Sequence, residues 1–257
     1  MYLPARRGEF LTRPRSNCYP RQVFDIRSNE PERIDTGEYT PDEYETFLRE
    51  IAFINRHFGD KRALEKTLLR DIKSDDIREF SVLDVGCGSG ELLRVIADYA
   101  EIRHHAASLT GLDLNPISSN TTRDLSRDYS SIVTVQGDAL TLPFSRDSFD
   151  YAISSLFFHH LTDDQIVAAL REMSRVARRG IFVIDLHRDV VPYIGYKIMC
   201  FVFRISELVR HDGSLSIRKG FSPDDLERLA RSARIQNFVV KRSSPGRVIL
   251  CTAGNQN

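Results

Sequence analysis

Residues 82–91 read VLDVGCGSGE, an apolar run that leads directly into three glycines at alternating positions. Leu92, Leu93, Val95 and Ile96 follow at the spacing of an amphipathic helix. A glycine-rich turn between a parallel strand and a helix lets a ligand approach the bare backbone. The free N–H groups at the start of the helix add a partial positive charge. This stretch therefore predicts the binding site of a nucleotide-like cofactor.

The spacing of the glycines narrows the choice of cofactor. In the dinucleotide fingerprint Gly-x-Gly-x-x-Gly, the pyrophosphate lies over the N-terminus of the helix. Here Glu91 stands where the third glycine of that fingerprint would fall. Asp84, two residues before the first glycine, would repel a pyrophosphate but suits a cationic ligand. S-adenosylmethionine carries an ammonium and a sulfonium group and no phosphate, and it meets this requirement.

The stretch resembles the first motif of class I S-adenosylmethionine-dependent methyltransferases, (V/L)LD(V/I)GCGTG, and departs from it only at Ser89. The resemblance implies that S-adenosylmethionine is the cofactor and that S-adenosylhomocysteine is the product. It also assigns five residues to the methionine end of the cofactor, namely Asp84, Gly86, Cys87, Gly88 and Gly90.

The chain beyond residue 82 alternates predicted strands and helices, which is the pattern of a doubly wound parallel sheet. The class implied is α/β, with a Rossmann-like sheet of seven mostly parallel strands, helices on both faces and an antiparallel last strand. A helix that starts with a capping box at Thr162 is expected to end near Gly180. The strands are expected at residues 81–85, 108–113, 132–136, 151–155, 181–185, 238–242 and 247–252.

Additional segments flank this pattern. Residues 1–39 lack sustained periodicity and are expected to form an N-terminal arm before a methyltransferase domain at 40–257. Within that domain, residues 40–75 predict a preface of two helices, the second covering residues 60–72. Residues 188–212 interrupt the alternation after the fifth strand and predict a helical substrate cap.

Three further positions at the ends of predicted strands carry groups that suit the cofactor. The Asp113-Leu114 pair places an acid where a ribose diol could donate to it, although Asp113 could instead cap the following turn. The Asp138-Ala139 pair resembles the adenine-binding segment of the family. Ser155 is expected on the floor of the site near the transferred methyl group.

Composition limits the partners of the chain. Lys+Arg and Asp+Glu balance at 36 each, so no field of one sign favours nucleic acid or an anionic membrane. The four cysteines are scattered and no apolar leader begins the chain, which favours the cytoplasm. The longest apolar run, residues 190–203, is too short for a transmembrane segment, and a buried or lid helix is favoured over membrane contact. The sequence leaves open whether the protein forms a homodimer.

The segment after the fourth predicted strand bears on the acceptor. It lacks the (N/D/S)PP(Y/F/W) tetrapeptide of amino-methylating enzymes, and residues 157–161, FFHHL, instead resemble small-molecule methyltransferases of the ubiquinone/menaquinone-biosynthesis type. With the apolar cap, this resemblance implies methylation of oxygen or carbon in a small hydrophobic or aromatic acceptor. The cap aromatics are equally well explained as the core of the cap.

Candidate general bases are His187, His211 and His160, while His159 or His160 is expected to fix the loop locally. No clear carboxylate triad appears, so no metal is expected. Three alternatives are kept: a protein or tRNA methyltransferase, a relative that binds the cofactor without turnover, and an NAD-dependent enzyme. Glu91 and Asp84 oppose the last of these.

Overall fold

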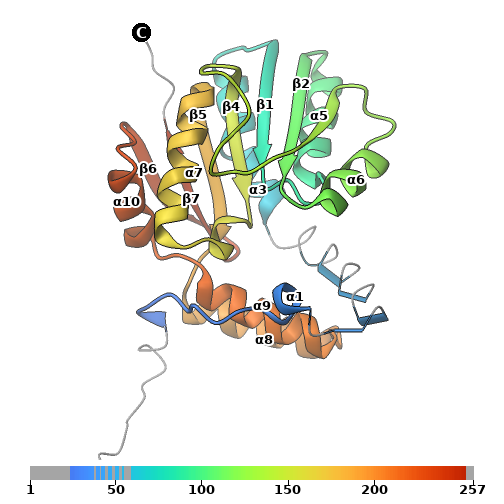
Figure 1. The fold of residues 1–257 in the computed structure, drawn as a ribbon, viewed down its shortest axis with the longest axis vertical. Coiled ribbons are helices and arrows are strands. Elements are labelled where there is room, and N and C mark those ends of the chain that lie inside the picture. The colour runs from blue at the N-terminus through green and yellow to red at the C-terminus, as the bar shows by residue number, and fades with distance from the viewer. Residues whose placement is uncertain are drawn as a thin grey trace, which may run out of the picture.

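The computed structural model describes residues 24–252, except for 38, 41, 44–45, 48–49, 52–53 and 55–58. Most of the predicted N-terminal arm lies outside the described residues. The described part is built on a sheet of seven strands in the order β3-β2-β1-β4-β5-β7-β6 (Figure 1). The strands are β1 (Glu79–Val85), β2 (Ala106–Asp113), β3 (Ile132–Gln136), β4 (Phe149–Ser155), β5 (Ala177–Leu186), β6 (Phe238–Ser243) and β7 (Arg247–Thr252).

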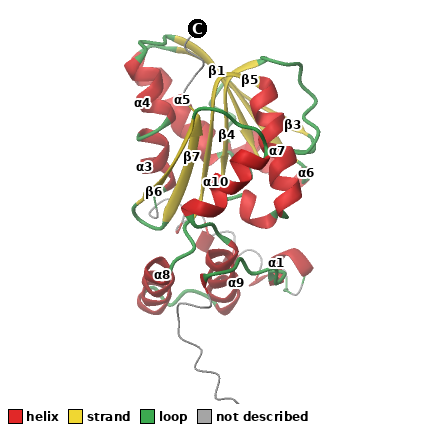
Figure 2. Cartoon of the chain, turned by 90° about the vertical axis from the view of Figure 1, so that its left-hand side faces the viewer, coloured by secondary structure: helices red, strands yellow, loops and turns green. Residues whose placement is uncertain are grey.

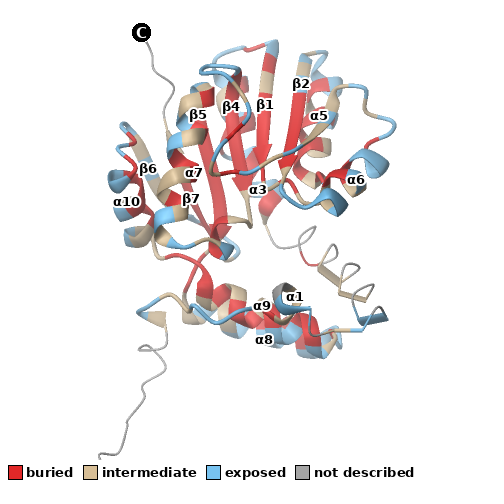
Figure 3. Cartoon of the chain, viewed as in Figure 1, coloured by how far each residue is buried: buried red, intermediate tan, exposed pale blue. Residues whose placement is uncertain are grey.

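The strand directions confirm the predicted fold class. Strands β1 to β5 pair in parallel, and β7 runs antiparallel to both of its neighbours, β5 and β6. The central strands are buried on both sides, as Figure 3 shows, because helices cover both faces of the sheet. The order of β3, β2 and β1 reverses at β4, so β1 and β4 meet at the switch point where open α/β sheets bind ligands.

Two apolar clusters hold the helices against the sheet. One face is covered by α7 (Asp163–Val176) and α10 (Pro223–Ser232), and the other by α3 (Asp60–Glu65), α4 (Leu68–Ser74) and α5 (Glu91–Arg103) (Figure 2). Helix α6 (Pro116–Leu125) ends beside α5, where Nη1 of Arg94 donates to Oγ of Ser126 at 3.3 Å. The predicted single helix at residues 60–72 is therefore two helices. Thr67 lies at the break, and its hydroxyl donates to the carbonyl of Ala63 at 2.7 Å, a bond that competes with regular helix.

The predicted helix end near Gly180 is wrong. Helix α7 ends at Val176, and β5 begins directly at Ala177. The chain is drawn into the sheet because Arg178 and Arg179 both pair with Asp150 on the neighbouring strand β4. Gly180 lies inside β5, where an added Cβ would approach the carbonyl oxygen of Thr252 to 3.1 Å. This glycine allows a close approach of strands and does not end a helix.

The cap is larger than predicted, because it runs beyond residue 212 to Lys219. It comprises α8 (Val190–Val202) and α9 (Glu207–Lys219), and the short α1 (Arg33–Thr36) packs against α9 (Figure 1). A third apolar cluster joins α8 and α9 to the described helical residues between 42 and 54. Across the described residues, no helix is both long and apolar enough to cross a membrane.

Candidate active site

The turn after β1 adopts the backbone conformation that glycine permits. Gly86, Gly88 and Gly90 have φ values of +74°, +54° and +72°. An added Cβ at Gly86 would lie 2.4 Å from Cγ of Phe157, and one at Gly90 would lie 2.5 Å from Cγ2 of Thr122. A Cβ at Gly88 would meet nothing within 4 Å. The first and third glycines are thus enclosed by protein, and the second faces open space.

Backbone donors lock this turn onto the end of β2. The N–H groups of Gly86 and Cys87 both donate to the carbonyl of Leu112, at 2.8 and 3.1 Å. The N–H of Gly88 donates to Oδ2 of Asp113 at 3.0 Å. The carboxylate that the sequence places at the ribose position therefore also shapes the glycine turn.

The other oxygen of Asp113 accepts from the N–H of Asn115 at 2.9 Å, so Asp113 does cap the turn as the alternative interpretation expected. Asn115 itself caps α6 through the N–H of Ile117. Each carboxylate oxygen can accept a second hydrogen bond, and the role of Asp113 toward a ribose stays a prediction.

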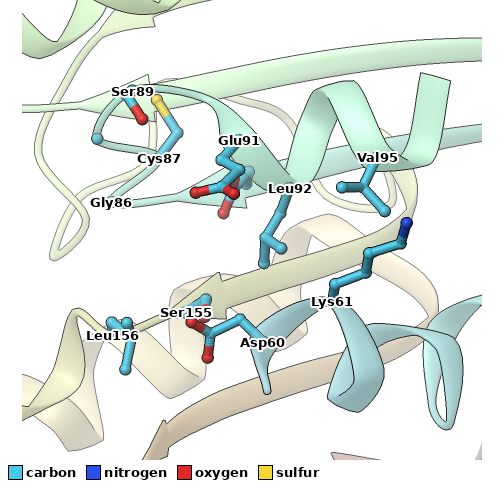
Figure 4. A pocket seen from close by; sticks show the side chains of 12 residues that line it. Asp60, Lys61, Gly86, Cys87, Ser89, Glu91, Leu92, Val95, Ser155 and Leu156 are labelled. Carbon is cyan, nitrogen blue, oxygen red and sulfur yellow. The ribbon is translucent and has the colours of Figure 1, made fainter. Parts of the chain in front are cut away.

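A pocket lies between this turn, the end of β4 and the start of α3 (Figure 4). Among the residues predicted to bind cofactor, it brings together Asp84, Gly86, Cys87, Gly88 and Ser155. The sequence analysis missed Asp60 and Lys61, which reach the pocket from α3. No local pattern marks these two residues, because their place depends on how α3 packs beside α5.

Asp84 is the most deeply buried acidic residue of the pocket. Asp84 is only 3% exposed, and no described residue donates a hydrogen bond or ion pair to it. Burial, and to a smaller extent the neighbouring Asp113 carboxylate, raise the pKa of Asp84 to about 7. Ser155 adds a buried Oγ that lacks a hydrogen-bond partner among the described residues. The pocket thus holds polar groups whose partners the described protein does not supply.

Cys87 contributes its backbone N–H to the hydrogen bonds that fix the glycine turn. Its side chain is buried, with Sγ 3.8 Å from Oγ1 of Thr122. Burial and the nearby Asp84 raise the pKa of the thiol well above its usual range, so it stays protonated. The side chain also fills the space beside Gly111, where an added Cβ would lie 2.8 Å from Sγ.

A buried ion pair ties the rim of the pocket to the last strand. Arg247 on β7 contacts both carboxylate oxygens of Asp60, with Nε at 2.5 Å from Oδ1 and Nη2 at 3.2 Å from Oδ2. Both side chains are buried. Because the two groups sit in a fixed bidentate geometry, Asp60 is held at the pocket entrance.

The predicted adenine and ribose residues form a neighbouring edge and do not line this pocket. The N–H of Gly137 donates to the carbonyl of Asp113 at 3.0 Å, which joins the ends of β2 and β3. Asp138 is exposed and its Oδ1 accepts from the N–H of Leu140, whereas Ala139 is buried. Leu114 is 67% exposed. The adenine-binding roles of these residues stay predictions.

The structure places the candidate bases His187 and His211 around the cap. His187 follows β5, its N–H donates to the carbonyl of Gly246, and burial followed by Arg242 lowers its pKa. His211 on α9 is more than half exposed, with Nδ1 at 2.8 Å from Oδ1 of Asp212. Neither residue lines the pocket beside the glycine turn.

His159 forms the closest buried contact between a histidine and a carboxylate in the described part of the chain. Its Nδ1 lies 2.7 Å from Oδ1 of Asp185, and its backbone N–H donates to Oδ2 at 3.3 Å. Both residues are buried, and these bonds fix the 3₁₀ turn η2 (Phe158–His160) onto β5, as expected of one histidine of the pair. His160 is exposed, and its ring lies 4.2 Å from that of His159.

The ionisation of this pair follows from its surroundings. Burial lowers the pKa of His159, although Asp185 opposes the shift. For Asp185, burial alone would raise the pKa, but His159 and the backbone N–H of Leu186 outweigh it and lower the pKa. A neutral imidazole therefore faces an ionised carboxylate near neutral pH. No local pattern marks this pair, because His159 lies in the turn η2 and Asp185 lies 26 positions later on β5.

One group of side chains has the residue types of a metal site. Ligand atoms of Glu32, His159 and His160 lie within 4.8 Å of one another. Nζ of Lys219 lies 3.0 Å from Glu32, so a protein cation already balances the carboxylate. The ion pair between Glu32 and Lys219 joins the N-terminal segment to α9, next to the two histidines of η2.

Comparison with known proteins agrees with this geometry. Residues 82–180 match the family described as a methyltransferase domain. Demethylmenaquinone methyltransferase from Bacillus licheniformis is 28% identical over 123 residues, which make up 48% of this chain and 51% of that protein. The tRNA (carboxymethyluridine(34)-5-O)-methyltransferase alkbh8 of Xenopus tropicalis is 31% identical over 125 residues, 48% of this chain and 18% of that protein. The chain thus spans about half the length of its demethylmenaquinone methyltransferase relative.

A solved structure extends the likeness of fold beyond the matched residues. Magnesium protoporphyrin IX methyltransferase from Synechocystis PCC 6803, solved with bound SAH, superposes with a TM-score of 0.53 at 13% identity, over 76% of this chain and 84% of that chain. Residues 82–180 thus match a methyltransferase domain, and the complete sheet has the strand order of the class I fold. The resemblance to S-adenosylmethionine-dependent methyltransferases of the quinone-biosynthesis type is confirmed, and S-adenosylmethionine is the cofactor of that class.

Proposed function

We propose that this protein transfers a methyl group from S-adenosylmethionine to oxygen or carbon of a small hydrophobic or aromatic acceptor, such as a quinone precursor or a phenol. The observation that carries the proposal is the pocket beside the glycine turn, where the buried Asp84 carboxylate has no described partner. A ligand with a cationic ammonium and sulfonium would supply that partner. The relative from Bacillus licheniformis, named for demethylmenaquinone, supports the acceptor class.

Different parts of the site would bind the cofactor and the acceptor. The glycine turn and Asp84 would hold the methionine part of the cofactor, and Asp113 the ribose. The bound cofactor supplies an electrophilic methyl group, so the protein's main task is to align an acceptor in line with it. The space between the cap and the carboxyl ends of the strands would receive that acceptor.

His159 is the general base that we favour over the predicted His187, His211 and His160. Its imidazole is neutral near pH 7, and Asp185 fixes one ring nitrogen, which leaves the other to accept a proton from a hydroxyl or carbon acid. His187 bonds to the hairpin through its backbone N–H, and His211, although paired with Asp212, is more than half exposed. None of the three lines the pocket beside the glycine turn.

A tRNA acceptor is the second candidate, supported by the relative from Xenopus tropicalis. The balance of 36 cationic and 36 anionic side chains weighs against it, because RNA binding relies on an excess of positive charge. The three described cysteines are free thiols, which fits a reducing compartment, and we therefore place the protein in the cytoplasm.

Calorimetric titration with S-adenosylmethionine, with NAD as control, is the first test. Binding of S-adenosylmethionine alone is expected, and binding of NAD alone would refute the proposal. With an acceptor found among quinones and phenols, His159→Gln should lower kcat about 10²–10⁴-fold without changing cofactor affinity. Because the pKa of His159 lies below its usual range, the wild-type kcat should fall only as the pH drops below about 6.5. An unchanged kcat in the variant would exclude His159 as the base.

A further inference from the structure

Helix α8 of the cap exposes a row of large apolar side chains. Phe201 is 84% exposed and Val191 is 72% exposed. The remaining members of this row are Ile194, Ile198, Val202 and Phe203, exposed by 52%, 58%, 63% and 56%. Positions 191, 194, 198, 201 and 202 recur at helical spacing, so they share one side of α8, which we call the outer face together with Phe203.

The opposite side of α8 is fully used in packing. Tyr196, Met199 and Cys200 are buried in the third apolar cluster, against α9 and the described helical residues between 42 and 54. A helix that is apolar all round is normally buried all round. Here only one side is covered, and a contiguous exposed apolar patch of this kind marks an interaction surface. The predicted buried or lid helix thus accounts for only the inner half of α8.

Within residues 190–206 the charged side chains are of one sign, and the acidic Asp189 and Glu207 lie just outside this stretch. Residues 190–206 contain no acidic side chain and two cationic ones, Lys197 and Arg204, both exposed. A second copy of this chain docked face to face would bring these cations together, which disfavours a homodimer through this surface. Anionic lipid headgroups would instead pair with the cations while the apolar side chains enter the interface.

The length of α8 also suits a helix that lies in the plane of a bilayer. Its 13 residues span about 20 Å, too short to cross the hydrocarbon core. Figure 3 shows exposed segments along α8 in the cap, which hangs below the carboxyl edge of the sheet. Docking through α8 would leave the pocket beside the glycine turn on the sheet side of the cap.

We propose that the outer face of α8 docks the protein on the surface of an anionic lipid bilayer. Apolar side chains from residues 191–203 insert at the level of the headgroups, and Lys197 and Arg204 contact anionic headgroups. Docking depends only on the exposed outer face of α8 and not on the proposed activity. Its benefit, that a lipophilic acceptor reaches the cap directly from the bilayer, rests on the proposed function.

Vesicle flotation with the full chain tests this surface. Vesicles of phosphatidylcholine mixed with the anionic lipid phosphatidylglycerol are compared with vesicles of phosphatidylcholine alone. We expect the wild type to float with the anionic vesicles, and Ile198→Ser with Phe201→Ser to lower the bound fraction at least about tenfold. The matched control is Ile102→Ser on α5. Ile102 is 75% exposed but lies outside the outer face, so this variant should bind as the wild type does.

The charge contribution is tested separately by Lys197→Glu with Arg204→Glu, which should weaken binding to anionic vesicles and leave the low binding to neutral ones unchanged. Absence of wild-type flotation, or equal flotation of the double serine variant, would overturn the proposal. So would a dimer in light scattering that the double serine variant dissociates. Calorimetry with S-adenosylmethionine on the same variants should give unchanged affinity, which separates failure of docking from failure of the proposed function.

Discussion

Asp84 at the cofactor pocket and the carboxylates under the cap differ in whether the described protein supplies them with a hydrogen-bond partner. Asp84 at the pocket is buried without a described donor. Under the cap, Asp185 bonds to His159, Asp212 accepts from two backbone N–H groups, and Glu32 pairs with Lys219. A buried charge without a partner is costly, so its retention at the pocket indicates a ligand, whereas the paired acids under the cap stabilise the protein itself.

The difference also separates two kinds of contact. The pocket is built from neighbouring strand ends and one turn, held mostly by backbone donors. The cap is fastened by side chains far apart in sequence, such as Arg27, which bonds to Asp163 and to the carbonyls of Leu161 and Lys219. Changes at the pocket should therefore alter cofactor affinity, and changes under the cap should alter stability first.

The largest effect is expected at the glycine turn, where the pocket itself is structural. Gly86→Ala should lower the free energy of unfolding by about 3–5 kcal/mol, since strain at φ +74° adds to a 2.4 Å approach to Phe157. Gly88→Ala has a similar φ but open space, and should cost only about 1–2 kcal/mol. Urea denaturation measures both, and equal losses would contradict the described packing around Gly86.

Asp84→Asn should stabilise the protein above pH 7 and weaken the binding of the cofactor. The folded protein keeps the proton of Asp84 up to about pH 7, whereas the unfolded chain loses it near 3.8, so wild-type stability falls as the pH rises between these values. The full difference, about 4 kcal/mol, is present above pH 7, and the variant should regain up to that amount there. Cofactor affinity of the wild type should fall up to about tenfold for each pH unit below 7.

Thermal unfolding and calorimetry between pH 5 and 8.5 measure these two effects. Asp150→Asn, which removes a carboxylate paired with Arg178 and Arg179, is the matched control and should destabilise the protein at pH 8. If Asp84→Asn destabilised the protein at pH 8 as well, the carboxylate would have a partner in the folded state, and the comparison between pocket and cap would fail.

Asp212→Ala should have the opposite signature. Its carboxylate accepts from the N–H groups of Arg33 and Ile34 and is 1% exposed, so its loss should cost about 3 kcal/mol of stability. Affinity for S-adenosylmethionine should not change. His211→Ala, which removes the exposed partner of the same carboxylate, should cost less than about 1 kcal/mol. Loss of cofactor affinity in Asp212→Ala would couple the cap to the pocket.

The smallest of these effects is expected at Asp113. Asp113→Ala should weaken cofactor binding by about 1–3 kcal/mol, through loss of a charge-assisted acceptor for the ribose. Asp113→Asn keeps one acceptor oxygen, for the N–H of either Gly88 or Asn115, and should lose less. Unchanged affinity in both variants would leave Asp113 with only its role in the turn.

Local sequence patterns predicted most strands of the sheet. Strands β3 and β7 have the predicted bounds, and β1, β2 and β4 begin two residues earlier than predicted. The departures have polar causes. Asp150 draws Arg178 and Arg179 into β5, and a bond from the Thr67 hydroxyl to the carbonyl of Ala63, four residues earlier, divides the helix predicted at residues 60–72. The apolar period of the chain does not register these polar contacts.

The candidate site divides in the same way. Asp84, Gly86, Cys87, Gly88 and Ser155 meet in one pocket as the motif implies, because strand ends and the turn bring them together. The place of Asp60 could not be predicted, since it depends on the packing of α3 and on Arg247 near the end of the chain. The contact between His159 and Asp185 could not be predicted either, because Asp185 lies 26 positions away on β5.

The fold class and the glycine turn follow from local sequence, because helical and strand periods and left-handed glycines are properties of neighbouring residues. Which charges are paired, which histidine is buried against a carboxylate and which side of α8 stays exposed are set by the folded chain. Those properties depend on distances between segments remote in the chain, and on the burial that sets the free energy of each charge and each apolar surface.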